Sequence, residues 1–408
     1  MESKVMQPTR KRHVVLDAMR GFAILGICIA NYPEFGLWTF LSGAQQAAIP
    51  GAGADRTVRF LEYLLVDGKF YTLFSLLFGI GFSLILRSAA RKGANGRGIF
   101  LRRMCILILI GLCHLLFLWS GDILFLYGVL GLFLPLFWKM SDRGVLISAG
   151  VLLMLPIAAE AARAIFHYDP GLPLSELQWS LCGKYGITAD NFAFWLQQSG
   201  SYKQISHFLM QGAVERMWEF VEGSRYFRVL GLFLVGLVIG RSDFYAKLDS
   251  YKGLLTKCAR TGFAAGLPIS FLYAWSCMEG EPWGAVVHSV IYTLSVFPLG
   301  AAFFAGFHLL YLKSPELKIF TVLAAPGRMA LTNYILQSVF GMLIFYGTGL
   351  ALGTKTSLLL ILAVSLGVYA LEVLLSRLWF RYFRFGPLEW IWRMLTYGSY
   401  LPIREREK

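Results

Sequence analysis

Long apolar runs, separated by short polar segments, dominate this sequence of 408 residues. Hydrophobic residues make up 57% of the chain and charged residues only 15%, whereas a soluble domain carries about 25% charged residues. A run of about 20 apolar residues is long enough to cross a bilayer as a helix. No segment alternates with the period of two that a transmembrane strand requires. The sequence therefore predicts an all-α, polytopic membrane helix bundle.

About ten transmembrane helices are expected, in one integral membrane domain that covers residues 1–408. Asp17 and Arg20 interrupt the start of the first apolar run, and no small-residue cleavage site follows it, so we interpret it as a retained span. An outer excursion (165–225) and a cytoplasmic tail (377–408) lie outside the spans. The expected spans are 14–32, 58–86, 99–119, 123–139, 144–164, 226–241, 259–278, 284–311, 329–347 and 356–376.

Basic residues gather in the segments on one side of the expected bundle, including the amino-terminal segment before residue 13 and the loop 87–103. The positive-inside rule then places both termini in the cytoplasm. Because these short segments account for the net charge of +14, no nucleic-acid partner is expected, and membrane lipids are the expected surroundings.

Residues 202–222, within the outer excursion, show the periodicity of an amphipathic helix. One interpretation is an interfacial helix that lies on the membrane, which we favour, and the other is a lid over an outward cavity. The residues spaced by three and four are Ile205, Phe208, Leu209, Gly212, Ala213, Arg216 and Phe220.

His114 and Asp122 lie in the most apolar stretch of the chain. An ionisable group at membrane depth rarely persists without a partner or a task. Eight residues correspond to about 12 Å along a helix, so direct contact between the two is not expected. Asp122 is predicted to cap the helix that follows it. His114 is either a neutral hydrogen-bonding group between helices or a catalytic group.

Asp17 and Arg20 share one helix face at the inner end of the first span. They form either a self-neutralising pair or a site where Arg20 grips a phosphate or carboxylate, and Gly21 allows a close approach. Lys69, between an aspartate and a long apolar run, is expected to have a specific partner.

The Pro326–Gly327 pair is expected to break the chain before a helix that starts at the cytoplasmic face. The free amides of that helix, together with Arg328, predict an anion site. A polar stripe then enters the membrane and serves either interhelical hydrogen bonding or, as we favour, a lined cavity. The stripe consists of Thr332, Asn333, Gln337 and Ser338.

Five motifs in order resemble the YeiB-like family of bacterial inner-membrane proteins. The resemblance covers nearly the whole chain and implies a multi-pass protein of the bacterial inner membrane. The motifs are Asp17-Ala-Met-Arg20-Gly, Lys69-Phe-Tyr71-Thr, Trp119-Ser-Gly-Asp122, Gly327-Arg328-Met-Ala-Leu-Thr-Asn333-Tyr334 and Phe385-Gly-Pro-Leu-Glu-Trp390.

More distantly, the Asp-x-x-Arg-Gly motif, with Asn31 at the end of the same span, is similar to the transmembrane acyltransferase superfamily, which includes the heparan-glucosaminide N-acetyltransferases. That resemblance implies that an acyl-CoA enters from the cytoplasm, that an acceptor waits on the far side and that a histidine assists the transfer. The N-acetyltransferases carry this histidine in the loop after the first span. This chain has none there, so His114 or Glu34 takes the role.

The leading hypothesis is a membrane acyltransferase that moves an acyl group from a cytoplasmic acyl-CoA, such as acetyl-CoA, to a hydroxyl or amine at the outer face. The acceptor is a small molecule, glycan or lipid, no metal is expected, and a homodimer is compatible with the sequence. The alternatives are a transporter or flippase for a small metabolite or lipid, and a sensor without turnover. The residues assigned are His114, Asp122 and Lys69 for catalysis, Arg20, Arg328 and Asn333 for the cofactor, and Asp17, Asn31, Glu34, Tyr71, Trp119, Tyr334 and Gln337 for the substrate.

Overall fold

The computed structural model describes residues 14–404, and within that range every named element is a helix. The only bridge of β type in the described range joins Phe383 to Arg404. The prediction of an all-α bundle is therefore confirmed. The basic residues expected before the first span lie outside the described residues.

Six helical stretches of the described chain are long and apolar enough to cross a membrane. Two further pairs pass the same test together but are bent: α11 (Tyr202–Glu222) with α12 (Arg225–Arg241) by 68°, and α15 (Lys318–Arg328) with α16 (Ala330–Phe345) by 79°. The described chain thus has six candidate membrane spans, or up to eight if each bent pair forms one span. The six are α1 (Val14–Phe35), the stretch Ala52–Ala90, α5 (Gly96–Phe117), α8 (Asp142–Phe166), α14 (Gly284–Lys313) and α17 (Leu358–Trp379).

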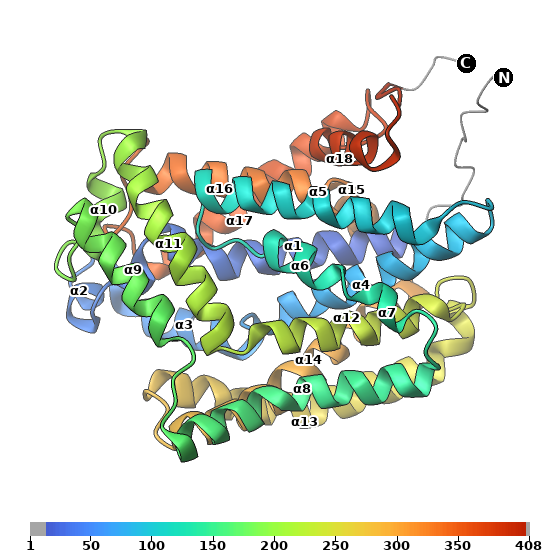
Figure 1. The fold of residues 1–408 in the computed structure, drawn as a ribbon, viewed down its shortest axis with the longest axis horizontal. Coiled ribbons are helices and arrows are strands. Elements are labelled where there is room, and N and C mark those ends of the chain that lie inside the picture. Colours follow the sequence, from blue (N-terminus) through green and yellow to red (C-terminus); the bar gives the residue numbers. More distant parts are fainter. Residues whose placement is uncertain (1–13, 405–408) are drawn as a thin grey trace.

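The expected number of about ten transmembrane helices stays a prediction. The expected span 123–139 consists of two short helices, α6 (Leu124–Gly131) and α7 (Leu134–Phe137), and α13 (Lys252–Met278) is not among the six. Both described ends of the chain lie toward the same end of the bundle (Figure 1). Their placement in the cytoplasm also stays a prediction.

The stretch Ala52–Ala90 contains a kink between α3 (Asp55–Leu65) and α4 (Lys69–Ala90). Gly68 adopts a φ of 75° there, a conformation that glycine adopts without a steric cost.

The outer excursion folds into α9 (Leu172–Tyr185), α10 (Phe192–Gln198) and α11, which gather with α2 (Gly43–Ala47) at one end of the bundle (Figure 1). The predicted periodicity of α11 is confirmed, because its residues Ile205, Phe208, Gly212, Arg216 and Phe220 are all buried. The tail helix α18 (Pro387–Tyr397) lies away from that end and packs on the start of α5, where the Trp392 indole donates to the Arg103 carbonyl oxygen at 2.9 Å.

Helices α1 and α15 touch backbone to backbone at two glycines. A Cβ atom on Gly21 would lie 1.9 Å from the carbonyl oxygen of Leu323, and a Cβ atom on Gly327 would lie 1.8 Å from that of Asp17. Small residues allow such an approach between membrane helices. The close approach that the sequence predicted at Gly21 is therefore made by α15.

The variant Gly21→Ala should lower the apparent melting temperature of the purified protein in detergent, because the added methyl group must force α1 and α15 apart. Overpacking of this kind costs about 1–3 kcal/mol. Gly367→Ala on α17 is the matched control, since no atom lies within 4 Å of its Cβ position. Equal melting temperatures for the two variants would contradict the backbone contact.

Candidate functional site

His114 and Asp122 are in direct contact, which corrects the expectation that they are separated. His114 Nδ1 lies 2.8 Å from Asp122 Oδ1, and both residues are only 1% exposed. The other carboxylate oxygen of Asp122 accepts from the Phe125 amide at 2.7 Å. The predicted cap of the following helix is thus confirmed, and one carboxylate serves both contacts.

A reversal of the chain between α5 and α6 brings the two residues together. The amides of Leu118 and Trp119 both donate to the His114 carbonyl oxygen, which ends α5. The loop then folds over the Trp119 indole, where a Cβ atom on Gly121 would lie 2.0 Å from the ring. The 12 Å estimate assumed one continuous helix, and the helix instead ends at Phe117.

The second imidazole nitrogen of His114 faces α16. His114 Nε2 lies 2.8 Å from Ser338 Oγ, and Ser338 is 1% exposed. The Tyr334 ring, one turn earlier on α16, lies 5.1 Å from the imidazole, and its hydroxyl donates to the Gly121 carbonyl oxygen at 3.4 Å. Asp122, His114 and Ser338 therefore form a continuous buried hydrogen-bonded chain between three segments of sequence.

Helix α11 holds the outer side of this loop in place. Arg216 Nε donates to the Ser120 carbonyl oxygen at 2.8 Å, and a Cβ atom on Gly212 would lie 2.7 Å from Ser120 Cβ. The Tyr202 hydroxyl donates to the Phe117 carbonyl oxygen at 2.7 Å. The sequence signal for this role was a charged residue, Arg216, on the apolar face of the predicted helix.

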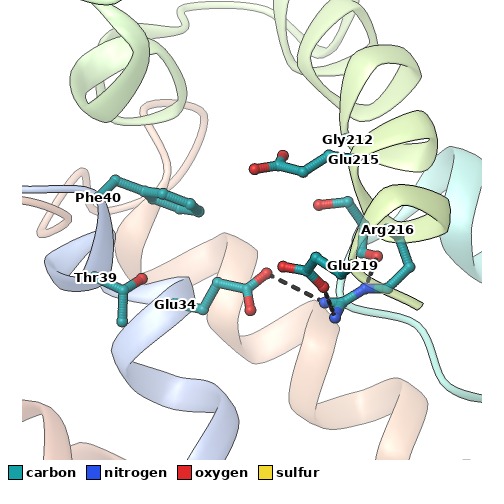
Figure 2. A pocket seen from close by; sticks show the side chains of 8 residues that line it. Glu34, Thr39, Phe40, Gly212, Glu215, Arg216 and Glu219 are labelled. Carbon is teal, nitrogen blue, oxygen red and sulfur yellow. Dashed lines mark hydrogen bonds and ion pairs between the residues drawn. The ribbon is translucent and has the colours of Figure 1, made fainter. Parts of the chain in front are cut away.

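A cavity of about 220 Å³ opens between α11, the end of α1 and this loop (Figure 2). Arg216 lies in its wall, pairs with Glu219 and reaches Glu34 at 3.6 Å. Helix α11 thus forms one wall of a cavity, as the lid interpretation expects, and the interfacial position of this helix stays a prediction. The lining residues are Glu34, Thr39, Phe40, Ser120, Gly212, Glu215, Arg216 and Glu219.

Trp119 links the cavity to the buried chain. Its indole stacks on Phe35 of α1 with ring centroids 4.3 Å apart, and its ring lies 6.2 Å from that of His114. Asn31, half-buried, lies on α1 one turn before Glu34. The structure therefore brings together six predicted or newly found groups at the outer end of the bundle: His114, Asp122, Trp119, Tyr334, Ser338 and Glu34.

The anion site predicted at the start of α16 is already filled by the protein. Glu389 of α18 accepts from the amides of Leu331 at 2.7 Å and Thr332 at 3.1 Å, and its other oxygen accepts from the Thr332 hydroxyl at 2.7 Å. Burial raises the pKa of the Glu389 carboxyl, and these hydrogen bonds oppose that shift. The amides are therefore not available to a phosphate, which corrects the prediction.

The break between helices α15 and α16 follows Arg328 and does not lie at the Pro326–Gly327 pair, where it was expected. Helix α15 contains Pro326 and Gly327 and ends at Arg328. The Arg328 guanidinium lies 3.6 Å above the Phe380 ring and reaches the Arg384 carbonyl oxygen at 3.4 Å. Arg328 is therefore engaged by the tail.

A group of arginines gathers at the end of the bundle where α18 packs on α5, which is the expected inner end. Arg20 pairs with Asp17 at 3.2 Å, with 29% of its side chain exposed. Arg103 lies 3.5 Å above the Trp392 ring, and both Arg20 and Arg393 repel its guanidinium. Arg103 and Arg393 were not among the predicted residues, because only the fold brings α5 and α18 together here.

Lys69 and Tyr71 belong to a different part of the bundle. Lys69 is fully buried, donates to the Tyr63 carbonyl oxygen at 2.6 Å and lies 4.9 Å from the Tyr273 ring. The Tyr71 hydroxyl accepts from Tyr292 at 3.1 Å. The predicted role of Lys69 beside His114 is not supported, because its contacts lead to α3 and α13. The expectation of a specific partner is confirmed.

The remaining polar residues of α16 face α17. Asn333 donates to the Pro326 carbonyl oxygen at 3.2 Å and to Ser376 Oγ at 3.1 Å. Gln337 donates to Glu372 at 2.9 Å. These contacts support interhelical hydrogen bonding for this part of the stripe rather than a lined cavity. Glu372 was missed, although a lone carboxylate in a long apolar run was a visible signal.

Comparisons with known proteins point to one family. Residues 239–399 match the family described as "Protein of unknown function (DUF418)". The chain is 32% identical to the uncharacterized protein YeiB of Escherichia coli (strain K12), over 95% of this chain and 96% of that protein. It is 30% identical to an uncharacterized 39.9 kDa protein of Bacillus acidopullulyticus, over 95% and 94%. It is 29% identical to the uncharacterized protein YxaH of Bacillus subtilis (strain 168), over 99% of both.

The variant Glu389→Ala should lower the apparent melting temperature, because it leaves the buried amides of Leu331 and Thr332 without their acceptor. The expected loss of stability is about 1–3 kcal/mol. Glu316→Ala, at an exposed glutamate, is the matched control and should leave the melting temperature unchanged. A Glu389 variant as stable as the control would show that the tail does not cap α16.

Proposed function

The chain belongs to the YeiB-like family of multi-pass membrane proteins, and we propose that it transfers an acyl group from a cytoplasmic acyl-CoA to a hydroxyl or amine acceptor at the outer face. A member of this family in a bacterium would act in the inner membrane. The observation that carries the proposal is the buried imidazole of His114, held by a carboxylate on one side and facing a hydroxyl on the other.

This arrangement suits a general base. The Asp122 carboxylate accepts a hydrogen bond from His114 Nδ1–H, so the free lone pair of the imidazole lies on Nε2. A neutral imidazole can take a proton from a hydroxyl or amine as the bond to the acyl carbon forms. The carboxylate also stabilises the imidazolium that forms when the base takes a proton. In this proposal His114 is the base and Asp122 its positioning residue.

The outer cavity supplies the place for the acceptor. It adjoins the loop that carries Asp122, since Ser120 lines it. Three carboxylates, from Glu34, Glu215 and Glu219, face one guanidinium there (Figure 2). The oxygen atoms of these carboxyl groups can accept hydrogen bonds, which favours acceptors that donate them, such as hydroxyl-rich or amine-bearing molecules.

The inner arginines supply a place for the donor. The phosphates of an acyl-CoA carry several negative charges, and guanidinium groups bind phosphate with two parallel hydrogen bonds. Arg20 and Arg393 repel the Arg103 guanidinium and Glu389 attracts it, so a bound phosphate would add a further attraction to this group of like charges. In this proposal these three arginines replace the predicted set of Arg20, Arg328 and Asn333.

A carrier is the second candidate, and the observation that favours it is Glu372. This carboxyl group is fully buried in α17, and its Oε1 atom has no hydrogen-bond partner among the described residues. Buried carboxyl groups of this kind mark proton pathways in many transporters. Flux of a substrate into proteoliposomes, without acyl-CoA, would favour the carrier.

The variant His114→Ala should lose acyl transfer by about 10²–10⁴-fold, the usual contribution of a general base, while acyl-CoA binding persists. Transfer of labelled acetyl groups from acetyl-CoA to candidate acceptors measures the first, and equilibrium binding measures the second. His308→Ala is the matched control, because His308 is also fully buried in a membrane helix but, among the described residues, hydrogen-bonds the Phe304 carbonyl oxygen alone. Unchanged transfer in the His114 variant would exclude the proposed base.

A further inference from the structure

Ser338 lies where the hydroxyl group that a general-base histidine deprotonates would lie. Its Oγ atom is 2.8 Å from His114 Nε2, and Asp122 holds the opposite nitrogen at 2.8 Å. We infer that Ser338 is the nucleophile of this protein and carries the acyl group as an ester between donor and acceptor. The inference rests on the proposed acyl transfer and adds to it a covalent step.

The hydrogen-bond directions follow from the Asp122 carboxylate. One of its oxygens accepts from the Phe125 amide and the other faces His114 Nδ1. Nδ1 therefore carries the proton, and Nε2 presents a lone pair. The Ser338 hydroxyl is then the donor to Nε2, which is the orientation that activates a serine.

The competing acceptor for the Ser338 proton is weak. In a helix, a serine or threonine hydroxyl commonly donates to the carbonyl oxygen four residues earlier. Ser148, Thr72 and Thr396 do so at 3.0, 2.8 and 2.6 Å. The corresponding distance from Ser338 Oγ to the Tyr334 oxygen is 3.5 Å. The Ser338 hydroxyl is thus turned toward the histidine rather than its own helix.

The position of Ser338 suits a relay between two faces of the membrane. It lies near the middle of α16, about 12 Å along the axis from the first residue, Ala330. The inner arginines lie near the start of the helix, and the outer cavity lies beyond the loop of Asp122. A donor and an acceptor that enter from opposite faces need not meet if one residue between them accepts and then releases the acyl group.

The chemistry balances without any further reactant. Ser338 Oγ attacks the thioester carbonyl carbon while His114 Nε2 takes the hydroxyl proton. The C–S bond breaks, and the departing thiolate takes that proton to give a free thiol and a serine ester. The acceptor hydroxyl or amine then attacks the ester and gives its proton to His114. The ester C–O bond breaks, and Ser338 Oγ regains a proton from the imidazole.

The test uses the full-length purified protein and radiolabelled acetyl-CoA without an acceptor. We expect a labelled, hydroxylamine-sensitive ester on the peptide that contains Ser338, identified by mass spectrometry. We also expect the wild-type protein to exchange free labelled CoA into acetyl-CoA, which requires an acyl-enzyme. Ser338→Ala should lose label and exchange and should slow transfer on the order of 10³-fold. Ser365→Ala is the control, since Ser365 is fully buried on α17 and its hydroxyl donates to the Leu362 carbonyl oxygen of the same helix.

Each outcome of these measurements either supports or contradicts the ester at Ser338. Ser338→Cys keeps a nucleophile, so it should retain acyl labelling as a thioester even if the alanine variant folds poorly. Full transfer by Ser338→Ala, together with its loss in His114→Ala, overturns the serine ester and leaves direct transfer as the function. Transfer by the wild-type protein without CoA exchange overturns the ester in the same way. Absence of both transfer and labelling in the wild-type protein overturns the proposed function and the ester together.

Discussion

A carboxylate and an imidazole buried in an apolar bundle are costly unless each satisfies the other and their remaining polar atoms are also bonded. Asp122 and His114 meet this requirement with three hydrogen bonds: one to each other, one from the Phe125 amide to Asp122 and one between His114 and Ser338. The chain reversal after α5, the start of α6 and the placement of α16 all follow from it. Loss of one member would leave a charged or polar group unpaired in the membrane interior.

Helix α16 connects this outer chain to the inner face. Its first amides are occupied by Glu389, its middle carries Ser338 and its opposite face donates to Glu372 through Gln337. Because a carboxylate of the protein itself neutralises the positive end of this helix, the proposed binding of an acyl-CoA depends on guanidinium groups instead. Those groups come from α1, α5 and α18, so the proposed donor site requires the tail to be docked.

Much of the fold could be predicted from the sequence, because lipid forces apolar runs of sufficient length into helices. The period of α11 was also visible, since burial on one side leaves a pattern that does not depend on the partner. The contact of His114 with Asp122 could not be predicted, because the spacing of a continuous helix does not apply where the chain turns at Trp119 and Gly121. The pairing of His114 with Ser338 rather than another polar residue of α16 depends on how two helices cross, which no local pattern encodes. Glu389 shows the same limit, since its partners lie 57 and 58 residues away.

The distribution of charge gives the two ends of the bundle different chemistry. Arginines that repel one another gather at the inner end, and carboxylates outnumber guanidinium groups in the outer cavity. In the proposed reaction a phosphate-rich donor is attracted to the arginines, and an acceptor that donates hydrogen bonds is held by the carboxyl groups of the cavity. Neither reactant needs to cross the apolar interior if a buried nucleophile stands between them. Ser338 lies at the middle of α16, within hydrogen-bond distance of His114, and could be such a nucleophile. The geometry therefore favours a covalent serine ester over direct transfer between donor and acceptor.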